Sequence, residues 1–189
     1  MANFVTHTED TAPIEALPII SKMTKSYGFL PNLLGTMAES PALLEAYTTL
    51  AGIFDKTSLT QTERQVVMMT NNLLNDCEYC MAAHSVISKM SGVEADVIEG
   101  LRNNTALADP QLEALRQFTI TVNKTRGWPE QQAVEAFLNA GYTEQNILEV
   151  ILGTSLKVLS NYTNHIAQTP LDDAFKPAKW SKEDLQNAA

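Results

Sequence analysis

The sequence CEYCMAAH, residues 77–84, contains both cysteines of the 189-residue chain and one of its three histidines. Side chains three or four residues apart lie on the same face of a helix. Cys77 and Cys80 can therefore form a redox pair on one helix face, and His84 lies one turn beyond Cys80 on that face. No other stretch of the chain concentrates as many reactive side chains.

The residue before this stretch, Asp76, is of a type favoured at helix N-caps. We expect it to cap a helix that places Cys77 in the first turn and Cys80 just beyond it. The positive end of a helix dipole stabilises a thiolate and lowers its pKa. The carboxylates of Asp76 and Glu78 oppose that effect, so the sequence leaves the net shift of the thiol pKa open.

Composition limits the classes of protein to which the chain can belong. With 44% hydrophobic residues, 189 residues suffice for one compact domain with its own core. A net charge of −9 and a pI of about 4.7 argue against nucleic-acid binding. The N-terminus does not resemble a signal peptide, and no apolar stretch reaches the roughly 20 residues that a membrane helix needs. We therefore expect a cytoplasmic protein without a membrane partner.

Apolar residues recur at helical spacing along most of the chain, whereas strand-like alternation is nearly absent. Prolines or capping residues precede the apolar runs, and glycines follow them. The pattern predicts an all-α bundle of roughly eight helices. They are expected over residues 16–27, 31–39, 41–55, 60–74, 77–91 and 94–102, then from 110 past 122, up to 140, and from 143 to about 165.

The composition of the two terminal segments predicts the domain organisation. Residues 1–170 are expected to form a single domain with an N-terminal arm over 1–12, and residues 171–189 an irregular tail. The tail contains Phe175 and Trp180, so we expect it to pack on this subunit or on a neighbour rather than to remain disordered. A weak similarity between residues 92–99 and 141–149 hints at a repeated helix pair.

Three interpretations of the cysteine stretch compete. Buried free cysteines are common in cores, so the pair could be structural. A zinc site could use Cys77, Cys80 and His84, with His165 as a fourth ligand, but a second Cys or His pair is missing. The interpretation that we favour is a thiol–disulfide pair with His84 as its acid–base partner, because two close cysteines in a reducing compartment are typical of catalytic or metal sites.

The sequence resembles a known family at this point. The residues that carry the resemblance are Glu63-Arg64, a helix, and then residues 75–84, with further support from residues 28–32 and 161–165. They are similar to the AhpD-like alkylhydroperoxidase branch of the carboxymuconolactone decarboxylase superfamily, and most of all to its peroxidase-related members. The resemblance implies an AhpD-like helical fold, assembly into trimers or hexamers, and no haem, metal or other cofactor.

The resemblance also implies roles for individual residues. Cys80 corresponds to the cysteine that attacks a hydroperoxide, Cys77 to the resolving cysteine, and His84 to the histidine of the proton relay. The activity implied is that of a thiol-dependent peroxidase or disulfide reductase, with a hydroperoxide as substrate and an external thiol as reductant.

Two positions depart from the family pattern. Members usually have a proton-accepting glutamate twelve residues before the first cysteine, where this chain has Gln65, and an amide cannot take a proton. Glu63 lies about 200° round the helix and fits a capping box with Thr60 better than a catalytic role. Tyr79 stands where some members have a histidine. We therefore expect the relay to rest on His84 and water, with His165 as a further pocket candidate.

Two other functions remain open. The superfamily also contains a lactone decarboxylase, a lyase that needs no redox cysteines. The loss of the acid at Gln65 also keeps open a non-enzymatic protein that responds to redox state or metal.

Overall fold

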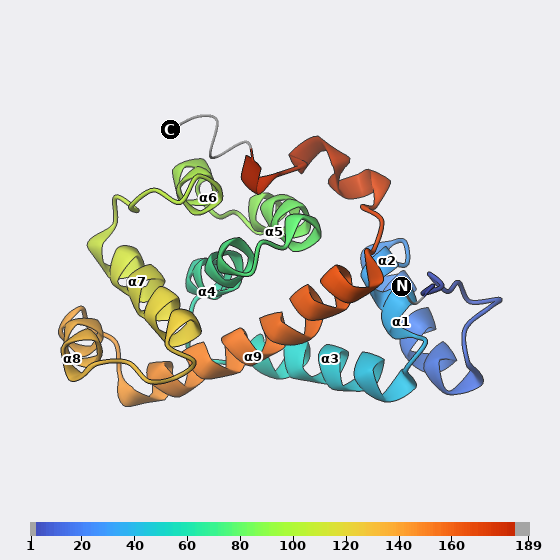
Figure 1. The fold of residues 1–189 in the computed structure, drawn as a ribbon, viewed down its shortest axis with the longest axis horizontal. Coiled ribbons are helices and arrows are strands. Elements are labelled where there is room, and N and C mark those ends of the chain that lie inside the picture. The colour runs from blue at the N-terminus through green and yellow to red at the C-terminus, as the bar shows by residue number, and fades with distance from the viewer. Residues whose placement is uncertain (1–2, 184–189) are drawn as a thin grey trace.

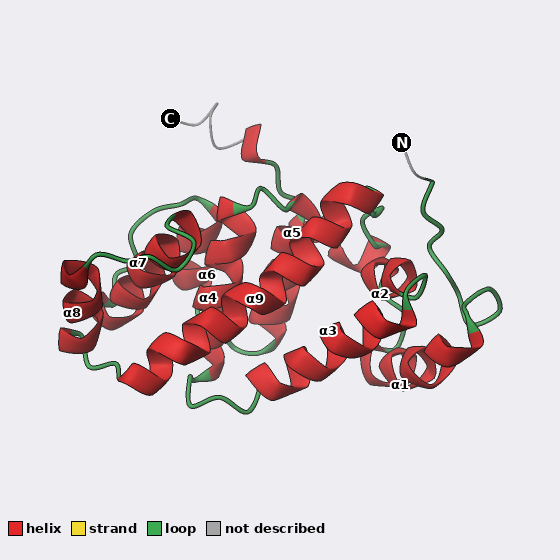
Figure 2. Ribbon diagram, turned by 60° about the horizontal axis from the view of Figure 1, so that its bottom comes forward, coloured by secondary structure: helices red, strands yellow, loops and turns green. Residues whose placement is uncertain are grey.

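The computed structural model describes residues 3–183, and all regular secondary structure in that part of the chain is helical (Figure 2). This confirms the predicted all-α fold. The bounds are α1 (Leu17–Tyr27), α2 (Asn32–Met37), α3 (Pro41–Phe54), α4 (Gln61–Leu74), α5 (Glu78–Met90), α6 (Ala95–Arg102), α7 (Pro110–Lys124), α8 (Gln131–Asn139) and α9 (Glu144–Ala167), with 3-10 helices η1 (Ile14–Ala16) and η2 (Asp173–Ala178).

The predicted capping box at the start of α4 is confirmed. The backbone N–H of Glu63 donates to Oγ1 of Thr60 over 3.2 Å, and the backbone N–H of Thr60 donates to Oε2 of Glu63 over 2.7 Å. These bonds satisfy two N–H groups that a helix N-terminus would otherwise leave free. Glu63 is thus used at the end of the helix, away from the cysteines.

The expected N-cap of α5 was wrong by one residue. Asp76 adopts a left-handed conformation with φ of 55°, and its N–H donates to the carbonyl of Leu73, so it closes the end of α4. The N-cap is Cys77, and its N–H donates to the carbonyl of Asn72 over 2.9 Å. Cys80 is therefore the third residue of α5, where the N-terminal dipole still acts.

The long helix α9 joins the two ends of the molecule. It runs across Figure 1 from the end that holds α7 and α8 to the end that holds α1 and α2, with α4 and α5 above it and α3 below it in this view. Gly153 permits this close crossing, because a Cβ there would lie 2.7 Å from Val67 Cγ1 and 2.8 Å from an atom of the Phe54 ring. The helix can therefore line both the main core and the cysteine region.

The interior consists of two clusters of buried apolar residues. The larger one lies among α3, α4, α6, α7 and α9 and includes Phe54, Met69 and Leu156. The smaller one lies among α1, α2, α3, α5 and the tail, and it contains both cysteines. The cysteine pair is thus built into the smaller core rather than exposed on the surface.

Residues 171–183, the described part of the tail, pack on this subunit, which was one of the two partners considered from the sequence. Phe175 and Trp180 are both buried. Trp180 donates its indole N–H to the carbonyl of Arg102 over 3.0 Å, and Arg102 donates from Nη1 to the carbonyl of Ala178 over 3.0 Å. These contacts hold η2 against α5 (Figure 1). Within the part of the chain that the structure describes, none of the helices has the length and apolar character needed to cross a membrane.

Candidate active site

Both cysteines lie at the N-terminal end of α5 as free, buried thiols. Cys80 lines a narrow cavity of about 60 Å³, whereas Cys77 lies behind it and does not reach the cavity. The aromatic rings of Tyr27, Tyr47, Tyr79 and Phe175 form much of the wall, and the side chains of His84 and Lys157 also line it. The geometry distinguishes the two thiols, because only Cys80 meets a space that a small molecule can occupy.

A polar stripe on α9 faces the cysteines. Lys157, Ser160, Asn161 and Asn164 recur at helical spacing and are all buried, so they share one face of the helix. Asn164 donates from Nδ2 to the Cys80 sulfur over 3.2 Å and lies 3.8 Å from the Cys77 sulfur. The stripe surrounds one sulfur atom with hydrogen-bond donors.

The environment shifts the pKa values of the two thiols in opposite directions. Burial would raise the pKa of Cys80, but the hydrogen bond from Cys77, the charge of Lys157 and hydrogen bonds from Ser160 and Asn161 lower it to about 5. The hydrogen bond with Cys80, followed by burial, raises the pKa of Cys77 well above its ordinary value. At neutral pH the site therefore holds a Cys80 thiolate beside a Cys77 thiol.

His84 links α4 to α9 within this site. Its Nδ1 lies 2.9 Å from Oε1 of Gln65, and its Nε2 lies 3.1 Å from Nζ of Lys157. Ser88 also donates to Oε1 of Gln65, over 3.1 Å. Burial, and then the charge of Lys157, lower the pKa of His84 well below its ordinary value. The imidazole is therefore neutral, with the Nδ1 proton donated to Gln65 and Nε2 accepting from Lys157.

Tyr79 connects the cavity to the tail. Its hydroxyl donates to Oδ2 of Asp172 over 2.5 Å and accepts the backbone N–H of Leu33 over 3.2 Å. Its ring packs edge-to-face on Phe175, with ring centroids 6.0 Å apart. Burial raises the pKa of Tyr79, followed by the bond to Asp172, so its hydroxyl stays protonated and serves to position the wall of the cavity.

Two residues considered from the sequence lie elsewhere. His165 is on the exposed side of α9, where its ring stacks with that of Tyr162 at a centroid distance of 6.4 Å. Among residues 3–183, no cluster of three or more His, Cys, Asp or Glu side chains is arranged to hold a metal ion. Both ring nitrogens of His84 already face Gln65 and Lys157, so the zinc interpretation finds no support in this geometry.

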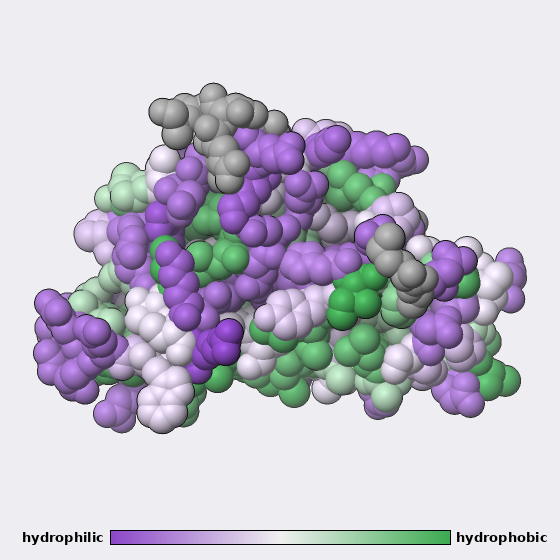
Figure 3. Space-filling model, in the orientation of Figure 1, coloured by the Kyte–Doolittle hydropathy of each residue, from purple (hydrophilic) through white to green (hydrophobic). Residues whose placement is uncertain are grey.

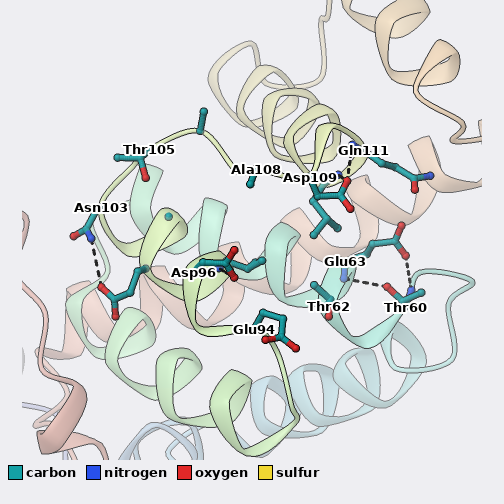
Figure 4. Close-up of a pocket in the computed structure, with 15 residues that line it drawn as sticks. Thr60, Thr62, Glu63, Glu94, Asp96, Asn103, Thr105, Ala108, Asp109 and Gln111 are labelled. Atoms are coloured by element: carbon teal, nitrogen blue, oxygen red, sulfur yellow. Dashed lines mark hydrogen bonds between the residues drawn. The ribbon is translucent and has the colours of Figure 1, made fainter.

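A wider hollow of about 900 Å³ shares no lining residue with this cavity (Figure 4). It is lined by acidic and polar side chains where α4, α6 and α7 begin. Glu63 there caps α4, and Asp109 accepts from the backbone N–H groups of Gln111 and Leu112 at the start of α7. Since these carboxylates already serve as helix caps and no cysteine or histidine joins them, the candidate active site is the smaller cavity.

Part of the sequence matches a known protein family. A model of the carboxymuconolactone decarboxylase family matches residues 41–121, which include α3 to α6 and the cysteine pair. This match supports the resemblance of the chain to the AhpD-like branch of the carboxymuconolactone decarboxylase superfamily. No protein of curated function matches the sequence.

Solved structures share the AhpD-like fold. An alkylhydroperoxidase AhpD core, peroxidase-related protein of Ralstonia eutropha JMP134 is 21% identical over 92% of this chain and 93% of that one, with a TM-score of 0.82. A peroxidase-related protein of Silicibacter sp. TM1040 is 17% identical over the same shares of the two chains, with a TM-score of 0.79. A variant of the debrominase Bmp8 in complex with 2,3,4-tribromopyrrole is 17% identical over 98% of each chain, with a TM-score of 0.78.

The candidate site contains residues that the sequence interpretation missed. Lys157, Ser160 and Asn164 were not assigned to the site, although a signal was present. A lysine stands in an otherwise apolar run of the last helix, with polar residues three, four and seven positions later. That spacing places them on one face, and a polar stripe in a core helix is typical of a functional site.

Proposed function

We propose that this AhpD-like protein is a thiol-dependent peroxidase or disulfide reductase that acts through Cys80 and Cys77. The observation that carries the proposal is the asymmetry of the pair. The thiol with the lowered pKa faces the cavity, and the thiol with the raised pKa lies behind it. A thiolate is the nucleophile, and a neighbouring thiol is what a sulfenic acid needs to form a disulfide.

The cycle has three steps. The Cys80 thiolate attacks the terminal oxygen of a hydroperoxide, so that an S–O bond forms, the O–O bond breaks and an alkoxide leaves. The Cys77 thiol then attacks the Cys80 sulfenic acid, which gives a disulfide and water. An external dithiol reduces the disulfide by exchange and is itself oxidised. His84 lines the cavity beside Cys80 and assists the proton transfer of the first step through its contact with Lys157.

The size of the cavity favours a small substrate group. About 60 Å³ holds only a few atoms, so hydrogen peroxide or the head of a short organic hydroperoxide fits beside Cys80. The aromatic wall suits an apolar organic part, which would extend towards the half-exposed ring of Tyr27.

Cysteine variants test the proposal directly. Cys80→Ser should reduce hydroperoxide consumption by at least about 100-fold, because it removes the nucleophile. Cys77→Ser should trap a Cys80 sulfenic acid that mass spectrometry detects, whereas peroxide should give a Cys77–Cys80 disulfide in the native protein. Met90→Ser, at an exposed position of the same helix, serves as a matched control. Unchanged peroxide consumption in Cys80→Ser would refute the mechanism and favour the lyase or binding alternatives.

A second candidate activity uses the same thiol pair. The aromatic wall suits the carbon–bromine edge of a flat ring, whose remaining atoms would extend towards Tyr27, and one structure of this fold is a debrominase in complex with a tribromopyrrole. Attack of the Cys80 thiolate on the bromine would give a sulfenyl bromide and a carbanion that takes up a proton. Cys77 would then close the disulfide and release bromide. Bromide release from a bromopyrrole, dependent on both cysteines and faster than peroxide reduction, would favour this activity.

The protein is also proposed to form a homo-oligomer. The outer side of α9 leaves Leu148, Ile151, Tyr162 and Ile166 exposed. Figure 3 shows hydrophobic surface gathered where α9 and α3 lie in Figure 1. We call these four residues the apolar ridge, and exposed apolar side chains along one face of a helix are typical of an interface between protein chains.

A further inference from the structure

Lys157 is buried at a place where its charge has no carboxylate partner. Its side chain is 1% exposed, and among the described residues no acidic group lies within ion-pair distance of Nζ. The one hydrogen bond found for its ammonium group goes to His84, which is neutral. A buried cation is costly, and an anion close to it lowers that cost.

The Cys80 thiolate supplies that anion. Lys157 and Cys80 line the same cavity, and the lysine charge acts on the sulfur strongly enough to lower its pKa. Asn164 donates to the same sulfur, and Cys77 offers it a thiol hydrogen bond. The site therefore holds one positive and one negative charge in a small buried volume.

The neutral state of His84 excludes it as the proton store at neutral pH. One ring nitrogen is bound to Gln65 and the other accepts from Lys157, so the imidazole has no proton to spare for a leaving group. Its geometry instead fixes the position of the lysine, because Gln65 and Ser88 hold the ring from the opposite side.

We propose that Lys157 is a catalytic residue that forms an ammonium–thiolate pair with Cys80 and protonates the leaving group, while His84 is a positioning residue for the lysine. This inference rests on the proposed function. When the thiolate attacks a hydroperoxide, the departing alkoxide takes a proton from Lys157, which becomes a neutral amine. After the external dithiol has reduced the disulfide, the Cys80 thiol returns its proton to that amine. The site is electrically neutral both before and after oxidation.

The proposal explains the glutamine at position 65. A carboxylate there would be a second anion in a volume that holds one cation, and it would draw the lysine charge away from the thiolate through His84. An amide keeps the imidazole in place without adding charge. A neutral Gln65 and a charged Lys157 on the two sides of His84 thus form one consistent arrangement.

The other titratable groups around the pair leave this balance unchanged. Burial raises the pKa values of Tyr47 on α3, Tyr79 on α5 and Tyr27 on α1, so their hydroxyls remain neutral. The carboxylate of Asp172 on the tail accepts from the Tyr79 hydroxyl and from the backbone N–H of Asn32. The backbone N–H of Leu33 donates to the Tyr79 hydroxyl in the same network. Cys77 is held as a thiol by its raised pKa.

The ion pair is tested by the pH dependence of Cys80 alkylation with iodoacetamide, followed by mass spectrometry. In the native protein the rate should rise through the Cys80 pKa of about 5 and then level off. Lys157→Met should move that midpoint upward by at least about one pH unit, towards the roughly 8.5 of a free thiol. Lys25→Met, which removes an exposed lysine of α1, should leave it unchanged. An unshifted midpoint in Lys157→Met would overturn the pair.

The proton-donor role is tested with Lys157→Arg. A guanidinium keeps the charge but cannot release a proton, so the alkylation midpoint should stay within about one pH unit of the native value. Peroxide reduction at saturating external dithiol should nevertheless slow by at least about 10-fold. Native turnover in Lys157→Arg would show that the lysine supplies charge alone, and would overturn the proton-donor role.

Gln65→Glu tests the charge balance independently, through the direction in which the rate of peroxide reduction changes. It should lower the rate of peroxide reduction in the native background, because it adds a second anion. It should raise that rate in Lys157→Met, where the new carboxylate favours a protonated His84. The same direction in both backgrounds would contradict the inference. If the native protein consumes no hydroperoxide, the proposed function and the proton-donor step both fail, whereas the alkylation experiment still decides whether the ion pair exists.

Discussion

At the scale of single residues, the site is defined by what surrounds one sulfur atom. Cys80 receives a hydrogen bond from Asn164 over 3.2 Å. The hydrogen bond from Cys77 and the positive charge of Lys157, together with polar groups of α9, lower its pKa and outweigh the burial that would otherwise keep it a thiol. Cys77 differs from it by one turn of helix, yet its pKa is raised. Position relative to α9, rather than the Cys-x-x-Cys spacing alone, decides which of the two thiols has the lowered pKa.

The neutral, buried imidazole of His84 predicts a loss of stability in acid. Its folded pKa lies well below 6.5, because burial and Lys157 disfavour the charged ring. Below about pH 6.5 the unfolded chain therefore binds a proton that the folded chain does not, so the contribution is complete above that pH and declines as pH falls. Between pH 6.5 and pH 5 this term should remove up to about 2 kcal/mol from the free energy of unfolding.

Urea unfolding at pH 7.5 and pH 5 measures this effect. The loss between the two pH values should be smaller in His84→Gln than in the native protein. His165→Gln, which removes an exposed ring on α9, is the matched control and should retain the full loss. Equal pH dependence in His84→Gln and the native protein would show that the ring is not held neutral.

At the scale of elements, the cavity is closed by pieces from both ends of the chain. Residues of α1, α2 and α3 form one wall, α5 and α9 bring the chemistry, and η2 places Phe175 over the remaining side. The tail is attached at two points, through Asp172 to Tyr79 and through Trp180 to Arg102. Tyr79 therefore links the helix that carries the cysteines to the segment that covers them.

Tyr79→Phe should loosen this cover. The change removes the hydroxyl that donates to Asp172, and the buried carboxylate is left with only the N–H of Asn32 as a donor. An under-satisfied buried polar group costs about 1–3 kcal/mol, so the region around residues 170–180 should exchange its amide hydrogens faster. Hydrogen exchange measured by mass spectrometry checks this. Tyr162→Phe, at an exposed position, should have no effect, and unchanged exchange in Tyr79→Phe would refute the linking role.

At the scale of the whole molecule, an acidic chain carries an apolar ridge on its longest helix. A net charge of −9 favours solubility and opposes contact between copies, so association needs an apolar surface to drive it. The exposed side chains along α9 supply one, and they lie on the side of the helix opposite to the polar stripe that faces the cysteines. One helix thus serves both the site and the proposed interface.

A charge placed on this ridge should prevent association. Ile166 is 71% exposed, and Ile166→Lys would put an ammonium group into the proposed interface. Analytical ultracentrifugation should give an oligomer for the native protein and a smaller species for the variant. Trp128→Lys changes an even more exposed residue, in the turn between α7 and α8, and should leave the oligomer intact. A native monomer would refute the proposed assembly.

Local signals in the sequence were sufficient for the helices. Capping residues and prolines act on N–H groups within three or four residues, so Thr60 and Asp109 mark helix starts that the structure confirms. The same locality explains the one wrong cap. Asp76 and Cys77 can both precede a helix, and the choice between them depended on how α4 ends and how α5 packs against it.

The cysteine pair and its histidine could also be recognised from the sequence, because they share one helix and their spacing alone puts them on one face. Lys157, Asn164 and Asp172 could not be placed in this way. They lie 73 to 93 residues from their partners in the site, and no short-range pattern determines which face of α9 or which part of the tail meets α5. That choice is made by tertiary packing, which buries the polar stripe of α9 against the cysteines and so decides which sulfur is ionised.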